Sequence, residues 1–231
     1  INRIFMEAPF KIYPSITGRD NIDWQNKIEE ADKFKIQEVA VFLSSFDKKE
    51  RDHLFKFLLK SSIKKVPFVH LRHDSDKEEI EFFIKNYNTE CFNIHEYGFD
   101  NLEKWAPYND KLYLELNYDN KLNKNVKVRK IGGFCIDLSH FKASIAHGTK
   151  EAEYIFLRKE KNIFLCNHLN GYDPNKRKDK HIITSLKDFD YLTTLPKFVF
   201  GKIIAIETYN SIKEQLEFKK HLEEILLNYL T

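Results

Sequence analysis

Short apolar runs alternate with longer amphipathic segments along the chain. The short runs are rich in β-branched and aromatic residues, as buried strands are, and the longer segments have the helical period. Strands are predicted at Arg3–Ala8, Glu38–Leu43, Val66–His70, Cys91–His95, Lys111–Leu116, Gly133–Asp137, Ile163–His168 and Lys202–Glu207. Helices are predicted at Asp23–Phe34, Lys48–Ser61, Asp76–Asn86, Leu102–Trp105, Lys142–Lys159, Leu186–Leu195 and Ile212–Leu230, with capping boxes that start at Ser75, Ser185 and Ser211.

This alternation predicts the fold. Eight strands that alternate with helices in one chain of 231 residues indicate a (β/α)8 TIM barrel, with a single domain over residues 1–231. The competing architecture is a doubly wound open sheet. We find no glycine-rich dinucleotide-binding turn of the kind such a sheet commonly carries.

Composition adds only a few constraints. Apolar residues make up 42% of the chain and charged residues 32%, which is ordinary for a globular protein. A net charge of +3 is too small to indicate nucleic-acid binding by itself. Three scattered cysteines without a C-x-x-C pair favour neither disulfides nor a cysteine-rich zinc site. With no signal peptide and no apolar stretch of membrane-spanning length, we expect a soluble, cytoplasmic protein.

The predicted strand ends carry the chemistry. In a TIM barrel, catalytic residues lie at the carboxyl ends of the strands. Six successive strands have a potential metal ligand at or next to their last position, namely His70, His95, Glu115, Asp137, His168 and Glu207. The following loops add His140, Asp179 and His181. Imidazole and carboxylate are ligands that Zn²⁺ and related ions accept, so the sequence predicts a metal site at this rim.

Side-chain parity gives an independent check. Because side chains alternate along a strand, residues two and four before each ligand should also point into the barrel. Most of these positions are small or apolar, and all three cysteines fall among them, which indicates buried fillers beneath the site. Asn93 is the exception, and we expect it to need a hydrogen-bond partner.

These residues resemble a known superfamily. A barrel with Glu115, Asp137, His168 and Glu207 on strands five to eight is similar to the xylose isomerase-like superfamily of sugar isomerases, epimerases and endonuclease IV. Three motifs resemble endonuclease IV in particular: D-x-x-H at Asp137 and His140, H-L-N from His168 with D-x-H at Asp179 and His181, and I-E-T around Glu207. His70 and His95 fall where that family has two early histidines.

The resemblance to endonuclease IV implies a cluster of two or three Zn²⁺, with Mn²⁺ as a possible substitute. Glu115 would bridge two metals, the first of which His70 and His95 also bind. The remaining ligands divide between the other two metals: Asp137, His168 and Glu207 for the second, and His140, Asp179 and His181 for the third. Three divalent cations against four carboxylates leave a charge of about +2, which suits a phosphodiester. The implied reaction is hydrolysis of DNA at an abasic site, with Glu115 and Glu207 as catalytic residues.

Two alternatives remain open. A sugar or sugar-phosphate isomerase or epimerase would use one divalent metal, and Glu115 and Glu207 would flank a substrate diol and move a proton. One metal with three carboxylates leaves a charge of about −1, which suits a neutral sugar better. A third possibility is a barrel that binds metals without catalysis.

Basic residues near the predicted site indicate where an anionic substrate would bind. Arg72 follows the first histidine, and Lys176 and Arg177 precede Asp179. We expect all three to contact substrate. The segment Phe10–Arg19 is predicted to be a loop that holds nucleic acid or covers a small sugar. No feature of the sequence indicates the oligomeric state.

Overall fold

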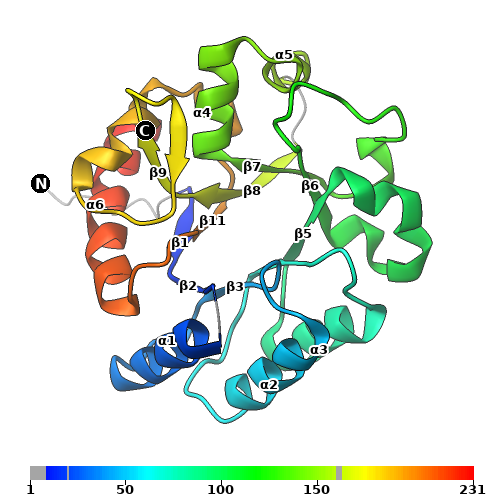
Figure 1. The fold of residues 1–231 in the computed structure, drawn as a ribbon, viewed down its shortest axis with the longest axis vertical. Helices are drawn as coiled ribbons and strands as arrows, with labels where there is room; N and C mark the ends of the chain where they lie inside the picture. The colour runs from blue at the N-terminus through cyan, green and yellow to red at the C-terminus, as the bar shows by residue number, and fades with distance from the viewer. Residues whose placement is uncertain (1–8, 20, 160–162) are drawn as a thin grey trace, which may run out of the picture.

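The computed structural model describes residues 9–19, 21–159 and 163–231. A nine-stranded parallel sheet has the order β1-β11-β8-β7-β6-β5-β4-β3-β2. Its strands are β1 (Lys11–Tyr13), β2 (Ser15–Ile16), β3 (Ala40–Phe42), β4 (Phe68–His70), β5 (Cys91–His95), β6 (Leu112–Glu115), β7 (Gly133–Asp137), β8 (Phe164–Leu169) and β11 (Ile203–Ile206). Because β1 and β2 are separated only by Pro14 and lie at opposite ends of this order, the sheet closes into a barrel with the helices outside (Figure 1).

The predicted TIM barrel is therefore confirmed. Its outer layer differs from eight regular α-helices, because several connections contain 3-10 helices. The α-helices of the described residues are α1 (Asn21–Lys33), α2 (Lys48–Leu58), α3 (Lys77–Tyr87), α4 (Leu138–His147), α5 (Lys150–Phe156) and α6 (Ile212–Leu230). Elsewhere the connections contain 3-10 helices: η1 (Glu96–Trp105), η2 (Tyr108–Lys111), η3 (Val128–Lys130), η4 (Leu186–Thr194) and η5 (Lys197–Val199). None of the helices in the described ranges has the length and apolar character needed to cross a membrane.

The beginning of the barrel differs from the prediction. The predicted strand Arg3–Ala8 lies outside the described residues, and the prediction of a loop over Phe10–Arg19 is wrong for half of that segment. Lys11–Tyr13 pairs with β11, and Ser15–Ile16 pairs with β3. Pro14 has no N–H to donate to a ladder, so it divides the first strand into two short pieces and obscures its pattern.

Two helix starts also differ from the prediction. The predicted helix Lys142–Lys159 is two helices, because α4 already begins after Asp137 and ends at Gly148, whose φ of +64° is a left-handed C-cap. Asp76, rather than Ser75, caps α3 by accepting from Glu79 N. The capping boxes at Ser185 and Ser211 are confirmed.

The barrel interior agrees with the parity argument. A compact cluster of buried side chains fills it: Tyr13, Ala40, Phe42, Phe68, Cys91, Tyr113, Cys135, Cys166, Ile203 and Ala205. All three cysteines are free and buried within this cluster. A second, larger apolar cluster packs the helices against the outside of the sheet. The site described below therefore lies above a packed floor.

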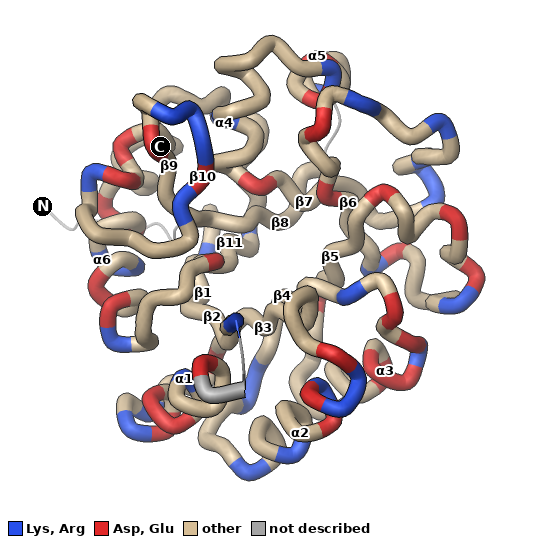
Figure 2. The backbone as a smooth tube through the Cα atoms, in the orientation of Figure 1, with Lys and Arg blue, Asp and Glu red and all other residues tan. Residues whose placement is uncertain are grey.

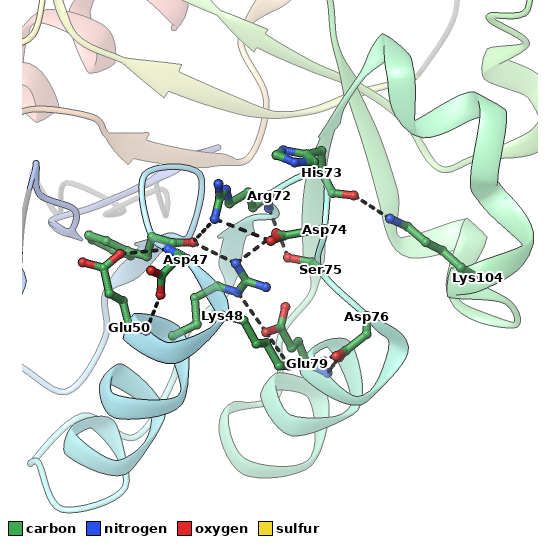
Figure 3. A network of polar contacts seen from close by, with 12 residues as sticks. Asp47, Lys48, Glu50, Arg72, His73, Asp74, Ser75, Asp76, Glu79 and Lys104 are labelled. Carbon is green, nitrogen blue, oxygen red and sulfur yellow. Dashed lines mark hydrogen bonds and ion pairs between the residues drawn. The ribbon is translucent and has the colours of Figure 1, made fainter.

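A buried ion-pair network holds the loop after β4. The Arg51 side chain is 0% exposed and donates to Glu79 Oε1 at 2.9 Å, to Asp74 Oδ1 at 3.0 Å and to the carbonyl of Phe46 at 2.8 Å. Arg72 donates to the same carbonyl at 3.0 Å, and Asp74, Glu79 and Arg72 converge in Figure 3. The network links the start of α2 to the loop that follows His70.

Removing one partner of this buried pair should destabilise the fold strongly. Arg51→Met leaves the buried Glu79 carboxylate with only the half-exposed Lys48 ammonium, 2.9 Å away, as its cation. Breaking a buried pair by removing one partner typically costs about 3–5 kcal/mol. We expect a loss of that size in the free energy of unfolding measured with urea. The double variant Arg51→Met/Glu79→Leu should be more stable than Arg51→Met alone. Lys77→Met, which breaks an exposed helical pair with Glu81, is the control and should cost under about 0.5 kcal/mol. A loss below about 1 kcal/mol for Arg51→Met would contradict this account.

A buried lysine supports the segment that follows β11. Lys27 on α1 is 3% exposed and donates to the carbonyl of Thr208, directly after Glu207, at 2.7 Å. Burial lowers its pKa to about 7, against the attraction of Asp23, Glu30 and Glu214. The unfolded chain has the ordinary lysine pKa near 10.4. Between about pH 7 and 10 the unfolded state therefore binds more protons, and this residue makes stability rise with pH.

Replacing Lys27 should remove that rise. We expect the stability of the wild type to increase relative to Lys27→Met, by an amount on the order of a few kcal/mol, as the pH is raised from 7 to 9.5. Unfolding by denaturant at several pH values measures the difference. Lys33→Met, an exposed substitution on the same helix, should show no such trend. Parallel pH profiles for the wild type and Lys27→Met would refute the assignment.

Candidate metal centre

The barrel register brings the predicted ligands to one rim. His70, His95, Glu115 and Asp137 are the last residues of β4 to β7, His168 is near the end of β8, and Glu207 follows β11. Neighbouring strands pair His95 with Glu115 and Asp137 with His168. Because all these strands are parallel, the side chains meet at the carboxyl end of the barrel, as predicted.

Glu115 lies at the middle of the group. Four imidazole nitrogens surround its carboxylate: His168 Nδ1 at 3.5 Å, His95 Nε2 at 3.7 Å and His70 Nε2 at 3.9 Å from Oε2, and His140 Nδ1 at 4.0 Å from Oε1. Asn93 donates to Oε2 at 2.8 Å, which is the hydrogen bond that the sequence analysis required. The Glu115 side chain is buried, so this carboxylate depends on these neighbours for its stabilisation.

Asp137 joins the centre to α4. Its Oδ1 accepts from the backbone N–H of His140 at 2.8 Å and from the Ser139 hydroxyl at 3.0 Å, which makes it the N-cap of the helix. Its Oδ2 lies 3.3 Å from His140 Nδ1 and 3.9 Å from His168 Nδ1. The same nitrogen of His168 is 3.3 Å from Glu207 Oε2.

The last two predicted ligands come from a separate hairpin. The strands β9 (Gly171–Asp173) and β10 (Lys178–Lys180) form a two-stranded antiparallel sheet that contacts α4. Asp179 Oδ1 lies 3.7 Å from His140 Nε2, and Asp179 Oδ2 lies 3.1 Å from His181 Nε2. Thus all nine predicted ligands converge, with His140, Asp179 and His181 as an outer group.

The spacing of these atoms fits a metal. Ligands bound tetrahedrally at about 2.0–2.1 Å from Zn²⁺ lie roughly 3.4 Å from one another. The nitrogen–oxygen separations between the candidate ligands are 3.1–4.0 Å, which brackets that value. Both ring nitrogens of His70 are buried without a hydrogen-bond partner among the described residues. Three groups have ligand atoms within 4.8 Å of one another: His70–Glu115–His168, Glu115–Asp137–His140 and Asp137–His168–Glu207.

The protonation of the histidines also fits a metal site. Burial disfavours the imidazolium of His168, but the Glu115 and Glu207 carboxylates raise its pKa to about 9. His140 and His181 are only partly buried, and Asp137 and Asp179 raise their pKa values to about 10 and about 9 respectively. By contrast, burial and the neighbouring imidazoles lower the pKa of His70 well below its usual value. The carboxylates therefore attract protons where a divalent cation would supply the positive charge.

The predicted substrate-binding residues lie at different places. Arg72 is partly exposed on the loop after β4, close to the rim. Lys176 and Arg177 are exposed in the turn of the β9–β10 hairpin, and Figure 2 shows the run of basic residues that continues along β10. Their role as substrate contacts stays a prediction.

Three neighbours of the centre were not anticipated. The Tyr118 ring lies 5.4 Å from the His140 ring at a tilt of 52°, and Tyr118 has a φ of +53°, an unusual backbone conformation for an aromatic residue. Tyr209 packs at 5.6 Å from His181, and Asn170 donates to Asp137 Oδ2 at 3.2 Å. Only Asn170 had a sequence signal, since it belongs to the H-L-N motif.

Comparison with known proteins supports the fold. No family model matches the sequence, and no curated protein is significantly similar to it. Among solved structures, the crystal structure of a D-tagatose 3-epimerase-like protein is similar, with a TM-score of 0.52, 13% sequence identity, and coverage of 93% of this chain and 97% of that chain. At this identity the likeness establishes the fold alone. It agrees with the predicted TIM barrel and gives no support for endonuclease IV in particular.

Metal binding should release protons from the chelator-treated protein. At pH 7, His140, His168 and His181 carry protons because their pKa values lie above 7. A metal ligand must be a neutral imidazole, so adding Zn²⁺ in weak buffer should release more than one proton per chain, measured with an indicator dye. For the same reason, affinity should increase from pH 6 to 9. Binding of Zn²⁺ without proton release would contradict these assignments.

Proposed function

We propose that this barrel is a metal-dependent isomerase or epimerase that acts on a sugar or sugar phosphate. The observation that carries the proposal is the position of two carboxylates around one imidazole nitrogen. Glu115 Oε2 and Glu207 Oε2 lie 3.5 and 3.3 Å from His168 Nδ1. The epimerase-like fold neighbour supports the same class.

The two carboxylates differ in access. The Glu115 side chain is 4% exposed, whereas that of Glu207 is 17% exposed at the open rim. In the proposed reaction, one carboxylate removes the proton from the carbon next to a carbonyl group, and the other returns a proton to the opposite face or to the neighbouring carbon. A divalent cation held by Glu115, Asp137, His168 and Glu207 supplies polarisation of the substrate oxygens. Tyr97 and Tyr209, beside His95 and His181, offer aromatic surfaces for a sugar ring.

The outer group favours a second candidate, phosphodiester hydrolysis. One metal needs neither His140, Asp179 nor His181, yet His140 Nε2 lies 3.7 Å and His181 Nε2 lies 3.1 Å from the Asp179 carboxylate. A cluster of two or three Zn²⁺ would stabilise the attacking and leaving oxygens of a phosphodiester, such as DNA at an abasic site. Against this candidate, half of the segment Phe10–Arg19, predicted to hold DNA, belongs to strands of the barrel wall.

Solvent hydrogen exchange tests the proposed reaction without knowledge of the exact sugar. The metal-loaded protein is incubated in D₂O with a panel of ketoses and their phosphates, and proton NMR follows the carbon next to the carbonyl group. We expect deuterium incorporation that stops on chelation and falls at least about 100-fold in Glu207→Gln, since proton transfer by a positioned group contributes about 10²–10⁴-fold. Glu217→Gln, exposed on α6, is the control.

His181→Ala distinguishes the two candidates. An isomerase with one metal should keep at least a tenth of its exchange rate in this variant. A hydrolase with an outer metal should lose one metal per chain and most of its activity. Chelator-sensitive nicking of an abasic duplex, absent in Glu207→Gln and accompanied by no exchange into any sugar, would show that the isomerase proposal is wrong.

A further inference from the structure

Two buried amides contact the centre and have no other side-chain hydrogen bond among the described residues. Asn93 donates from Nδ2 to Glu115 Oε2 at 2.8 Å, and Asn170 donates from Nδ2 to Asp137 Oδ2 at 3.2 Å. Both residues are 0% exposed. Each leaves its Oδ1 buried without a partner in the described part of the chain.

The unpaired Oδ1 of each amide is expected to lower the stability of the fold. A buried acceptor without a hydrogen bond costs about 1–3 kcal/mol, and native proteins contain few of them. The orientation itself is well defined, because a flipped amide would place Oδ1 against a carboxylate oxygen. Both amides lower stability, and both donate to a carboxylate of the candidate centre. We infer that they act on these carboxylates.

Asn167 shows what a structural amide looks like in this barrel. It is also 0% exposed, and all its polar atoms are satisfied by backbone groups. Its Nδ2 donates to the carbonyls of Ile136 at 3.1 Å and Val199 at 2.9 Å, and its Oδ1 accepts from Gly201 N at 2.7 Å. Unlike Asn93 and Asn170, it contacts no candidate ligand in these bonds.

We propose that Asn93 and Asn170 are positioning residues that orient the carboxylates of Glu115 and Asp137 for metal binding. Asn93 occupies one lone pair of Glu115 Oε2, so that the other lone pair faces the His70–His168 side and Oε1 faces His140. Asn170 does the same for Asp137 Oδ2, because Oδ1 already caps α4. Hydrogen bonds of this kind fix ligand geometry and tune affinity. The inference rests on the metal centre of the proposed function.

Metal titration tests this role directly. Chelator-treated Asn93→Leu and Asn170→Leu are titrated with Co²⁺ and Zn²⁺ against a chromophoric competitor, and the visible spectrum of the Co²⁺ form is recorded. We expect Asn93→Leu to weaken binding about 10- to 100-fold and to change the Co²⁺ spectrum. Asn170→Leu should have the smaller effect, because its hydrogen bond is longer. Asn93→Ser, whose hydroxyl is too short to reach Glu115, replaces the leucine variant if that variant does not fold.

Asn167→Leu is the matched control. Losing three backbone hydrogen bonds should lower its stability without changing the metal affinity or the Co²⁺ spectrum of the folded protein. The inference is overturned if both asparagine variants bind metal like the wild type. A wild-type chain that binds no metal would instead overturn the proposed centre, and the positioning role with it, which is a distinguishable result.

Discussion

The buried carboxylate of Glu115 is the group on which the rest of the centre depends. A carboxylate in this environment needs nearby positive charge, and four imidazoles within 4.0 Å provide the positions from which protons or metal ions can supply it. Those imidazoles come from β4, β5, α4 and β8. They reach the carboxylate only when the barrel closes, so the charge balance of the site depends on closure. The packed floor of small and aromatic side chains keeps water from reaching the carboxylate from below.

Asp137 shows how local folding and site chemistry use the same residue. Its Oδ1 satisfies the first turn of α4, and its Oδ2 faces the candidate ligands. Because the helix starts at this cap, His140 lies one turn later on the same side, 3.3 Å from Oδ2. The D-x-x-H spacing is thus a helix-capping motif and a ligand motif at once, which ties the direction of α4 to the geometry of the centre.

Much of the barrel and the candidate site could be predicted from the sequence, for identifiable reasons. Strands β4 to β8 were predicted within a few residues, since continuous apolar runs mark parallel strands, and their last residues carry the ligands. The first strand was not predicted, because Pro14 divides it into two short pieces. The start of α4 was not predicted, because Asp137 was interpreted only as a ligand and not as the N-cap of the helix. The contacts of Asn93, Asn170 and Lys27 depend on which strands become neighbours in the closed barrel, which spacing along the chain does not reveal.

The hairpin that carries Asp179 has a consequence for how such centres change during evolution. Its two strands form a sheet of their own and share no ladder with the barrel. Mutations in this segment can therefore add or remove the outer ligands while the ladders of the barrel and its six strand-end ligands remain intact. Within one architecture, substitutions in this one hairpin would change how many ions the candidate centre can hold, so lineages could diverge in chemistry while keeping the same barrel.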